Sequence, residues 1–120
     1  IAFIDYNKNQ VDGPIEEIAD ISPVDKKWEA FKWNVIVVED GHDENQIDEA
    51  ITKAKTCQDK PTMIILNTIK GKGVSFVEDL GANNHHINFD SESLESAIEE
   101  IDSDKVVADA SIINKEFDNI

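Results

Sequence analysis

Three short, continuous apolar runs are the feature that most constrains the fold of this chain. They read IAFI at residues 1–4, VIVV at residues 35–38 and MIIL at residues 63–66. A strand with one face in water alternates apolar and polar residues, but these runs are apolar at every position. Continuous runs are typical of strands in a parallel sheet whose two faces are both covered by helices.

A helical pattern separates the first two runs. Ser22 and Pro23 predict an N-cap followed by a proline at the first helical position, and Val24, Trp28 and Phe31 then share one apolar stripe. We expect this stripe, together with Trp33, to belong to the hydrophobic core rather than to a surface that binds a ligand.

Two more helices are predicted further along the chain. One begins at Asp43, with Gln46 three residues later as in a capping box, and the other begins near Asp90 or Ser91. Their apolar faces consist of Ile47, Ala50, Ile51 and Ala54 in the first, and of Leu94, Ala97, Ile98 and Ile101 in the second. The alternation of strands and helices predicts an α/β fold, a parallel sheet with flanking helices joined by right-handed crossovers.

Charge and cysteine content exclude several classes of function. The net charge is −15, with 26 acidic and 11 basic residues, so we expect neither nucleic acid nor an anionic membrane surface as a partner. Cys57 is the single cysteine, which rules out an internal disulfide and favours a reducing compartment. No run approaches the ~18 apolar residues of a membrane span, and no signal peptide is visible. We therefore expect a cytoplasmic protein.

Polar segments follow each of the three predicted strands. Because the carboxyl ends of parallel strands meet at one edge of the sheet, ligands of such folds bind there. Residues 5–13, after the first strand, read DYNKNQVDG. Asn7 offers a neutral amide oxygen suited to a hard cation, although Asn after a strand more often forms a turn, and on the residues alone we favour the turn.

This segment resembles the second half of the thiamine diphosphate motif of transketolases. The resemblance implies that the Asn7 side chain and the backbone carbonyl of Asn9 bind a divalent ion, Mg²⁺ or Ca²⁺, which holds the cofactor diphosphate. It also implies that Val11 packs against the cofactor rings.

Two further stretches resemble the same family, in the same order. Residues 28–43 contain WEAFKWNVI followed by DGHD, similar to the family pattern W-x-A-F-G-W-x-V with D-G-H-D after it. Lys32 replaces the usual glycine, from which we expect a less strained helix end. Residues 60–78 contain KPT and then TIKGKGVSFVE, which is the most specific match. Together the matches cover about residues 1–101.

The resemblance also implies a functional histidine in the loop before the last predicted helix. His85 falls at that position, where it would act as a catalytic residue that contacts the cofactor diphosphate and the substrate, while His86 stands where the family often has glycine. The choice between the two stays open. For His42 we favour a role in bracing a turn over a catalytic one, and for the loop with Lys70 and Lys72 a solvated turn is as well supported as a phosphate contact.

The resemblance covers only part of a complete site. The family's Gly-Asp-Gly segment, whose Asp is another metal ligand, is not found, and the glutamate that activates the cofactor belongs to a pyrimidine-binding domain. We therefore expect residues 1–101 to be a partial thiamine diphosphate domain, inactive alone, and residues 102–120 to be a tail or an additional helix. When complete, it would act on sugar phosphates with a pyrimidine-binding domain or subunit, as a homodimer or heterotetramer.

Two alternatives remain from the sequence. A 1-deoxy-D-xylulose-5-phosphate synthase has a similar K-G-K-G run followed by histidine, within the same cofactor class. From a different class, the chain could be a non-catalytic α/β interaction module.

Overall fold

A computed structural model describes residues 1–103 of the chain. These residues belong to two compact units, Ile1–Ile87 and a second one that begins at Asn88. The sheet and all the predicted site residues lie in the first unit. The predicted tail, residues 102–120, lies outside the described residues except for its first two.

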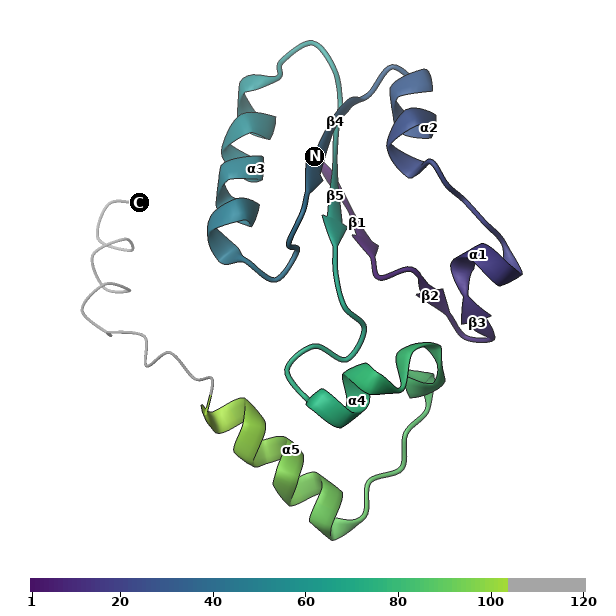
Figure 1. The fold of residues 1–120 in the computed structure, drawn as a ribbon. Coiled ribbons are helices and arrows are strands. Elements are labelled where there is room, and N and C mark those ends of the chain that lie inside the picture. Colours follow the sequence, from purple (N-terminus) through teal and green to yellow (C-terminus); the bar gives the residue numbers. More distant parts are fainter. Residues whose placement is uncertain (104–120) are drawn as a thin grey trace, which may run out of the picture. The chain divides into compact units, whose positions relative to one another are not determined.

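The three apolar runs form one parallel sheet, as predicted. Its strands are β1 (Ala2–Tyr6), β4 (Asn34–Val38) and β5 (Thr62–Asn67), in the order β1-β5-β4. Both pairings with β5 are parallel, so all three carboxyl ends point the same way (Figure 1). The central strand β5 is the most buried, and its Ile64 has no exposed surface.

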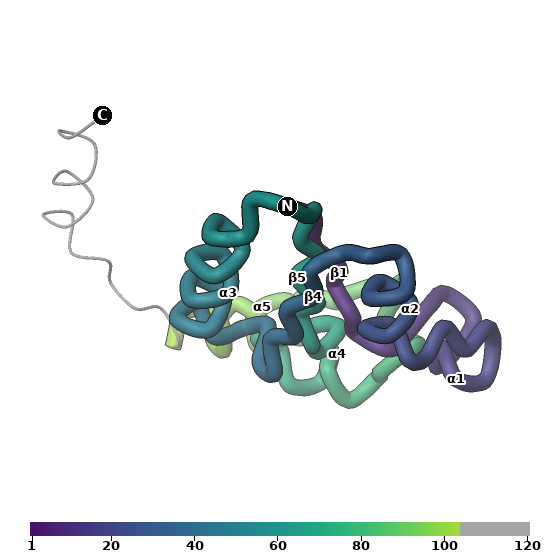
Figure 2. The backbone as a smooth tube through the Cα atoms, turned by 90° about the horizontal axis from the view of Figure 1, so that it is seen from above, coloured from purple at the N-terminus to yellow at the C-terminus, as the bar shows by residue number. Residues whose placement is uncertain are grey.

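A helix lies on each face of this sheet, although Phe3 of β1 and Val37 of β4 remain 49% and 43% exposed. The helix α3 (Glu44–Thr56) lies on one face, where Ala50 and Ala54 pack against Val38 and Ile64. The helix α2 (Val24–Ala30) covers the other face, and its core cluster consists of Val24, Met63 and Ile65 with Trp28 and Trp33 against it. Seen from above, α2 and α3 lie on opposite sides of the strands (Figure 2). The α/β prediction is confirmed.

The N-terminus of α3 has the cap that the sequence predicts. Asp43 is the N-cap, and its carboxylate accepts hydrogen bonds from the backbone N–H of Asn45 (2.9 Å) and from Nε2 of Gln46 (3.1 Å). These bonds, the one from Gln46 foremost, lower the pKa of the Asp43 carboxyl. The Gln46 Oε1 atom accepts from the backbone N–H of Asp40 rather than from that of Asp43, so the capping box is closed through the preceding loop.

The start of α2 differs from the prediction. Pro23 is the N-cap, with no side-chain capping bond, and not the first helical residue. The Ser22–Pro23 peptide bond is cis, and the Ser22 hydroxyl is hydrogen bonded to the Tyr6 hydroxyl at 3.3 Å. Ser22 is therefore engaged with β1 instead of with the helix, and its prediction as an N-cap was wrong.

The end of α2 is a Schellman motif with a lysine in the left-handed position. Lys32 has φ 68°; its N–H donates to the carbonyl of Glu29, and the N–H of Trp33 donates to that of Trp28. The ring centroids of Trp28 and Trp33 lie 4.8 Å apart, which supplies the apolar contact of this motif. The prediction of a less strained helix end was wrong, because Lys32 adopts the conformation that favours glycine.

Phe31 is also not where the stripe predicted it. It is the C-cap of α2 and is 73% exposed. The chain leaves the helix at Ala30, so Phe31 no longer follows the helical period that would turn it toward the core. Trp28 and Trp33, in contrast, both pack against the core as expected.

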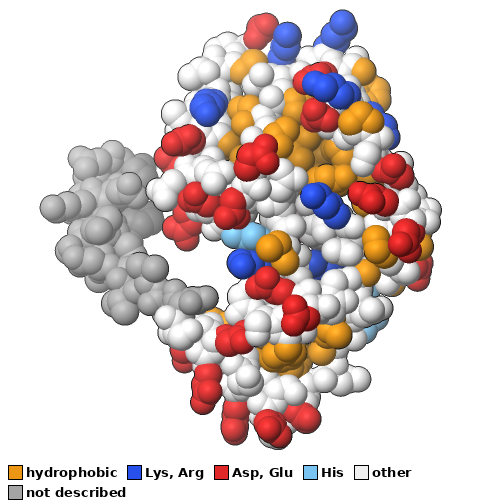
Figure 3. Space-filling model, in the orientation of Figure 1, with side chains coloured by type: hydrophobic (Ala, Val, Ile, Leu, Met, Phe, Trp, Pro, Cys, Tyr) orange, Lys and Arg blue, Asp and Glu red, His pale blue; other side chains and the backbone are white. Residues whose placement is uncertain are grey.

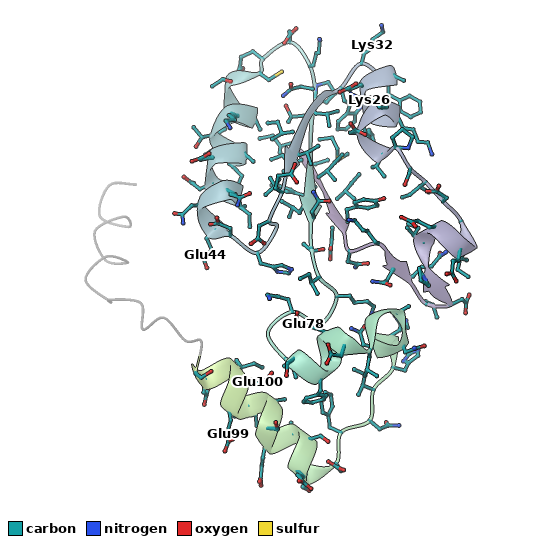
Figure 4. All side chains as sticks on the ribbon, viewed as in Figure 1. Lys26, Lys32, Glu44, Glu78, Glu99 and Glu100 are labelled. Atoms are coloured by element: carbon teal, nitrogen blue, oxygen red, sulfur yellow. The ribbon has the colours of Figure 1, made fainter. Side chains whose placement is uncertain are left out.

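Replacing Lys32 by glycine is expected to stabilise the protein by about 1 kcal/mol, because glycine adopts a left-handed conformation without the steric cost that a Cβ imposes. Lys32 lies at the exposed end of α2 (Figure 4), where its side chain makes none of the ion pairs found among the described residues. Chemical denaturation measures the change. An alanine at the same position is the control and should give little or no gain, since it keeps the Cβ.

Several short elements were not predicted. The strands β2 (Asn9–Gln10) and β3 (Gly13–Pro14) form an antiparallel hairpin that leads into α1 (Ile15–Ile18). The loop after β5 contains α4 (Ser75–Asp79) and a 3₁₀ helix, η1 (Gly81–His85). The hairpin and α4 lie beyond the carboxyl ends of the sheet strands (Figure 1).

The second unit contains α5 (Ser91–Ser103), which begins where the sequence predicts. The Asp90 carboxylate accepts from the N–H of Ser93 at 2.8 Å. Of its predicted apolar face, Ala97 is buried, while Leu94, Ile98 and Ile101 are about half exposed.

Acidic side chains are spread over the face of the molecule shown in Figure 3, with hydrophobic side chains among them.

Candidate functional site at the carboxyl edge of the sheet

The loops after the three strands are joined by hydrogen bonds. The N–H of Gly41, after β4, donates to the carbonyl of Asn67 at 2.7 Å. The N–H of Ile69, after β5, donates to Nε2 of His42 at 2.8 Å, and the Thr68 hydroxyl is hydrogen bonded to the Asp5 carboxylate on β1. His42 therefore braces two loops, as favoured from the sequence, and carries its ring proton on Nδ1 when it is neutral.

Asn7 directly follows β1 and forms a tight turn with Asn9. Its Oδ1 accepts from the Asn9 N–H at 3.0 Å, and Nδ2 of Asn9 donates to the Asn7 carbonyl at 2.8 Å. This is the Asx turn that the residues alone favour. An amide oxygen has two lone pairs, so the bond to Asn9 leaves Asn7 Oδ1 able to accept a second partner.

The register of the β2–β3 hairpin sets the direction of the Asn9 carbonyl. The pairs Asn9–Pro14 and Gln10–Gly13 face one another, and just beyond them the Ile15 N–H donates to the Lys8 carbonyl at 2.9 Å. Since bonded and non-bonded pairs alternate in an antiparallel ladder, Asn9 and Pro14 form a non-bonded pair. The N–H and C=O of Asn9 therefore point away from β3, toward the side on which Asn7 Oδ1 lies.

Two residues beside this oxygen pair stand out, Lys8 by its backbone conformation and Val11 by its exposed apolar side chain. Lys8, between Asn7 and Asn9, has φ 60°, an uncommon conformation for a residue with a side chain. Val11 is at the tip of the hairpin and is 58% exposed. An exposed valine at a turn presents an apolar surface to any group bound there.

Lys8 lines two cavities at this edge. One, of about 530 Å³, lies on the side of α2 and includes Tyr6, Ser22 and Asn67 among its lining residues. The other, of about 390 Å³, lies between the loops after β4 and β5 and includes His42. Both contain acidic and basic side chains, so neither has a uniform charge.

His85 is the last residue of η1, and this segment packs against the hairpin. Contacts join η1 to both β2 and β3, so the fold brings the predicted histidine segment to the hairpin that carries Asn9. The rings of His85 and His86 are both exposed, with centroids 4.6 Å apart in an edge-on arrangement.

The loop lysines have different surroundings. Lys72 forms an ion pair with Glu78 (Nζ to Oε1, 3.5 Å), and the same Glu78 oxygen accepts from the Gly73 N–H at 3.0 Å. Glu78 lies on α4 (Figure 4). An ion pair this exposed contributes little to stability, but its carboxylate fixes the course of the glycine-rich loop.

Sequence reasoning missed Asn84, which holds this loop together. It is 8% exposed, and its Nδ2 donates to the carbonyls of Lys70 (2.9 Å) and Val77 (3.0 Å). An asparagine in a polar loop carries no sequence signal of burial. The nearby Gly71 and Gly73 did carry a sequence signal, although of backbone conformation rather than of burial. Two glycines separated by one residue often mark a loop whose φ angles are positive, as they are here.

The described part of the chain lacks two features. Within residues 1–103, no three His, Cys, Asp or Glu side chains are grouped so that they could hold a metal ion. The helices of the same residues are all too short or too polar to cross a membrane.

Comparison with known proteins identifies the family. A family model described as the transketolase thiamine diphosphate binding domain matches residues 1–104. The chain is 45% identical over 104 residues to the 6-deoxy-6-sulfo-D-fructose transketolase subunit SqwG of Clostridium sp. (strain MSTE9), covering 87% of this chain and 37% of that protein. It is 33% identical over 101 residues to one of the apulose-4-phosphate transketolase subunits of Phocaeicola vulgatus, covering 84% and 35%.

A longer transketolase is also similar. Transketolase 2 of Escherichia coli is 40% identical over 73 residues, which is 61% of this chain and 11% of that protein. The chain thus spans little more than a third of the first two relatives' length, and neither the synthase nor the interaction module is favoured. The chain belongs to the transketolase family and matches its thiamine diphosphate binding domain.

Proposed function

We propose that the chain is part of one subunit of a transketolase, in which it contributes the diphosphate-binding side of the active site. Two of its relatives are named as transketolase subunits, which implies a partner subunit. The partner would supply the pyrimidine-binding domain, in a homodimer or heterotetramer. The proposal rests on Asn7 Oδ1, which accepts the Asn9 N–H just after the end of β1, and on the hairpin register, from which we infer that the Asn9 carbonyl faces the same side.

The donor set of this pair fits a hard divalent cation. Amide and backbone oxygens are ligands that Mg²⁺ and Ca²⁺ accept, and Asn7 Oδ1 retains a lone pair. Because residues 1–103 hold no cluster of acidic or histidine ligands, the remaining ligands would come from the cofactor diphosphate, water and a carboxylate elsewhere in the protein. Bound thiamine diphosphate supplies the carbanion chemistry of ketol transfer.

The other predicted residues would act around this metal. Val11, exposed at the hairpin tip, would pack against the cofactor rings and exclude water from them. His85 would donate a hydrogen bond to the diphosphate or to a sugar hydroxyl, and it could hold or release a proton there. Its support is the contact of η1 with the hairpin that carries Asn9. Residues 1–101 would make up the partial domain.

We propose a sugar with an anionic group as the substrate, with sugar phosphates as the first choice. The relatives' names specify 6-deoxy-6-sulfo-D-fructose in one case and apulose 4-phosphate in the other, and both sugars carry an anion. We also propose that the protein is cytoplasmic, because a chain with a single cysteine suits a reducing compartment and sugar phosphates would be its substrates there. The test is an assay of two-carbon transfer by the intact protein with its partner subunit, thiamine diphosphate and Mg²⁺. Phosphorylated and sulfonated ketoses would serve as donors, and absence of transfer from every donor would sink the proposal.

The isolated chain is expected to show no ketol transfer and at best millimolar affinity for the cofactor. Two neutral oxygens alone cannot hold Mg²⁺, and with it the diphosphate, against competition from water, and the partner's groups are missing. Isothermal titration calorimetry with thiamine diphosphate and Mg²⁺ measures this affinity directly. Micromolar binding by residues 1–120 would contradict the expectation.

A further inference from the structure

Two buried amide atoms in this part of the fold have no hydrogen-bond partner. Among residues 1–103 they are Nε2 of Gln10, on β2, and Oδ1 of Asn84, on η1. One is a donor and the other an acceptor, and β2 and η1 are in contact. Leaving either group buried and unpaired costs about 1–3 kcal/mol.

The orientation of the Asn84 amide is fixed by its other bonds. Both hydrogens of Nδ2 are used, toward the carbonyls of Lys70 and Val77. A flipped amide would set its oxygen against two carbonyl oxygens. Oδ1 is therefore the atom that needs a donor.

The position of Asn84 is also fixed by packing. Gly71 leaves room for it, because a Cβ at residue 71 would lie 2.8 Å from Asn84 Nδ2. The Gln10 amide, by contrast, is held by none of the side-chain hydrogen bonds found in the described residues, so it is the amide that is free to turn.

We propose that Gln10 and Asn84 satisfy each other, directly after a rotation of the Gln10 side chain or through one bridging water, and so couple the hairpin to η1. Each polar group would gain the partner that burial demands. The pair would link residue 10, next to the proposed metal ligand Asn9, with residue 84, next to the proposed catalytic His85. Both are then positioning residues that set the distance between the metal and the histidine. This consequence rests on the proposed function, whereas the pairing itself does not.

A double-mutant cycle on the intact protein tests the pairing. Gln10→Met keeps the side-chain length and removes the donor, and Asn84→Ala removes the acceptor. We expect Gln10→Met to lower the equilibrium constant for folding about tenfold in the wild-type background and less than about threefold in the Asn84→Ala background. An equal loss in both backgrounds would overturn the pairing.

A second variant keeps the test decisive if Asn84→Ala does not fold. Gln10→Glu presents an acceptor to the Asn84 oxygen and should cost more than Gln10→Met, because like partial charges would then face each other in a buried site. If Gln10→Glu is tolerated as well as Gln10→Met, no acceptor faces residue 10 and the proposal fails.

The positioning role has its own readout, which does not depend on activity. Ring resonances of His85 should shift in Gln10→Met and stay unchanged in Asn83→Ala, a matched change at an exposed residue of η1. The ring of His42, bonded to Ile69, should not respond to either. An unmoved His85 resonance in Gln10→Met would refute the positioning role.

Activity separates this inference from the proposed function. In the assembly with its partner, Gln10→Met should raise the KM for thiamine diphosphate at least about fivefold with a smaller change in kcat. The reason is that the metal and the histidine would no longer be held at the distance that suits the diphosphate. If the wild-type assembly transfers no ketol unit, the proposed function fails while the cycle and the ring resonances still decide the pairing. If the wild type is active and Gln10→Met leaves the KM unchanged, the positioning role is refuted alone.

Discussion

Replacement of Asn7 by alanine is expected to weaken binding of Mg²⁺ and thiamine diphosphate by the assembled enzyme roughly 100-fold. A metal ligand is lost, and at about 1.4 kcal/mol per factor of ten this corresponds to about 2.8 kcal/mol. The loss is compounded because Asn7 Oδ1 also holds the Asn9 N–H at 3.0 Å. Without that bond the Asn9 carbonyl is no longer held toward the same side.

Asn7→Asp is the matched control for this prediction. A carboxylate keeps an acceptor for the Asn9 N–H and offers the cation an oxygen, so we expect binding within about tenfold of the wild type. Titration calorimetry gives both affinities, and denaturation without the cofactor measures the contribution of the turn separately. If Asn7→Ala binds as tightly as Asn7→Asp, then Asn7 is not a metal ligand.

The sheet was predictable because its signal is local. Each continuous apolar run became a parallel strand, and Asp43 with Gln46 marked the start of α3. The position of β5 between β1 and β4 was not predictable from the runs alone, since strand order is decided by which crossovers pack. Thr62, which precedes the run at residues 63–66, is also buried, and this agrees with the central position of β5 in the sheet.

The end of α2 shows why a helical stripe can mislead. Periodicity placed Phe31 in the core, but the helix stops at Ala30 and Phe31 is exposed. The helix ends because Lys32 adopts a left-handed conformation, which also turns Trp33 back toward the core. A lysine in the sequence does not predict a left-handed residue, because glycine is the residue that prefers this conformation.

The sequence motifs propose individual residues for the candidate site, but they do not predict how these residues are connected. The motifs named Asn7, Asn9, Val11 and His85, and these assignments stay proposals. Spacing could not reveal that η1 packs on the hairpin. Short elements such as α4 and η1 are held by bonds distant in sequence, like that from Asn84 to Lys70, and such bonds leave no periodic pattern.

Gly71→Ala is expected to destabilise the protein by about 3 kcal/mol, the sum of a positive φ and a steric clash. Gly71 has φ +87°, and an added Cβ would lie 2.6 Å from Val77 Cγ1 and 2.8 Å from Asn84 Nδ2. Neither neighbour can move at little cost, because Val77 is buried and the Asn84 amide is held by two hydrogen bonds. The displaced Asn84 should also carry η1 away from the hairpin.

Gly73→Ala separates the two contributions. Gly73 has φ +99°, but no atom lies within 4 Å of an added Cβ, so only the backbone strain of about 1 kcal/mol should remain. Chemical denaturation of both variants gives the difference, about 2 kcal/mol, which measures how tightly Asn84 is held. His85 ring resonances should shift in Gly71→Ala and not in Gly73→Ala. Equal destabilisation by the two substitutions would mean that Asn84 yields to the new methyl group, and a residue that yields so readily could not fix the histidine beside it.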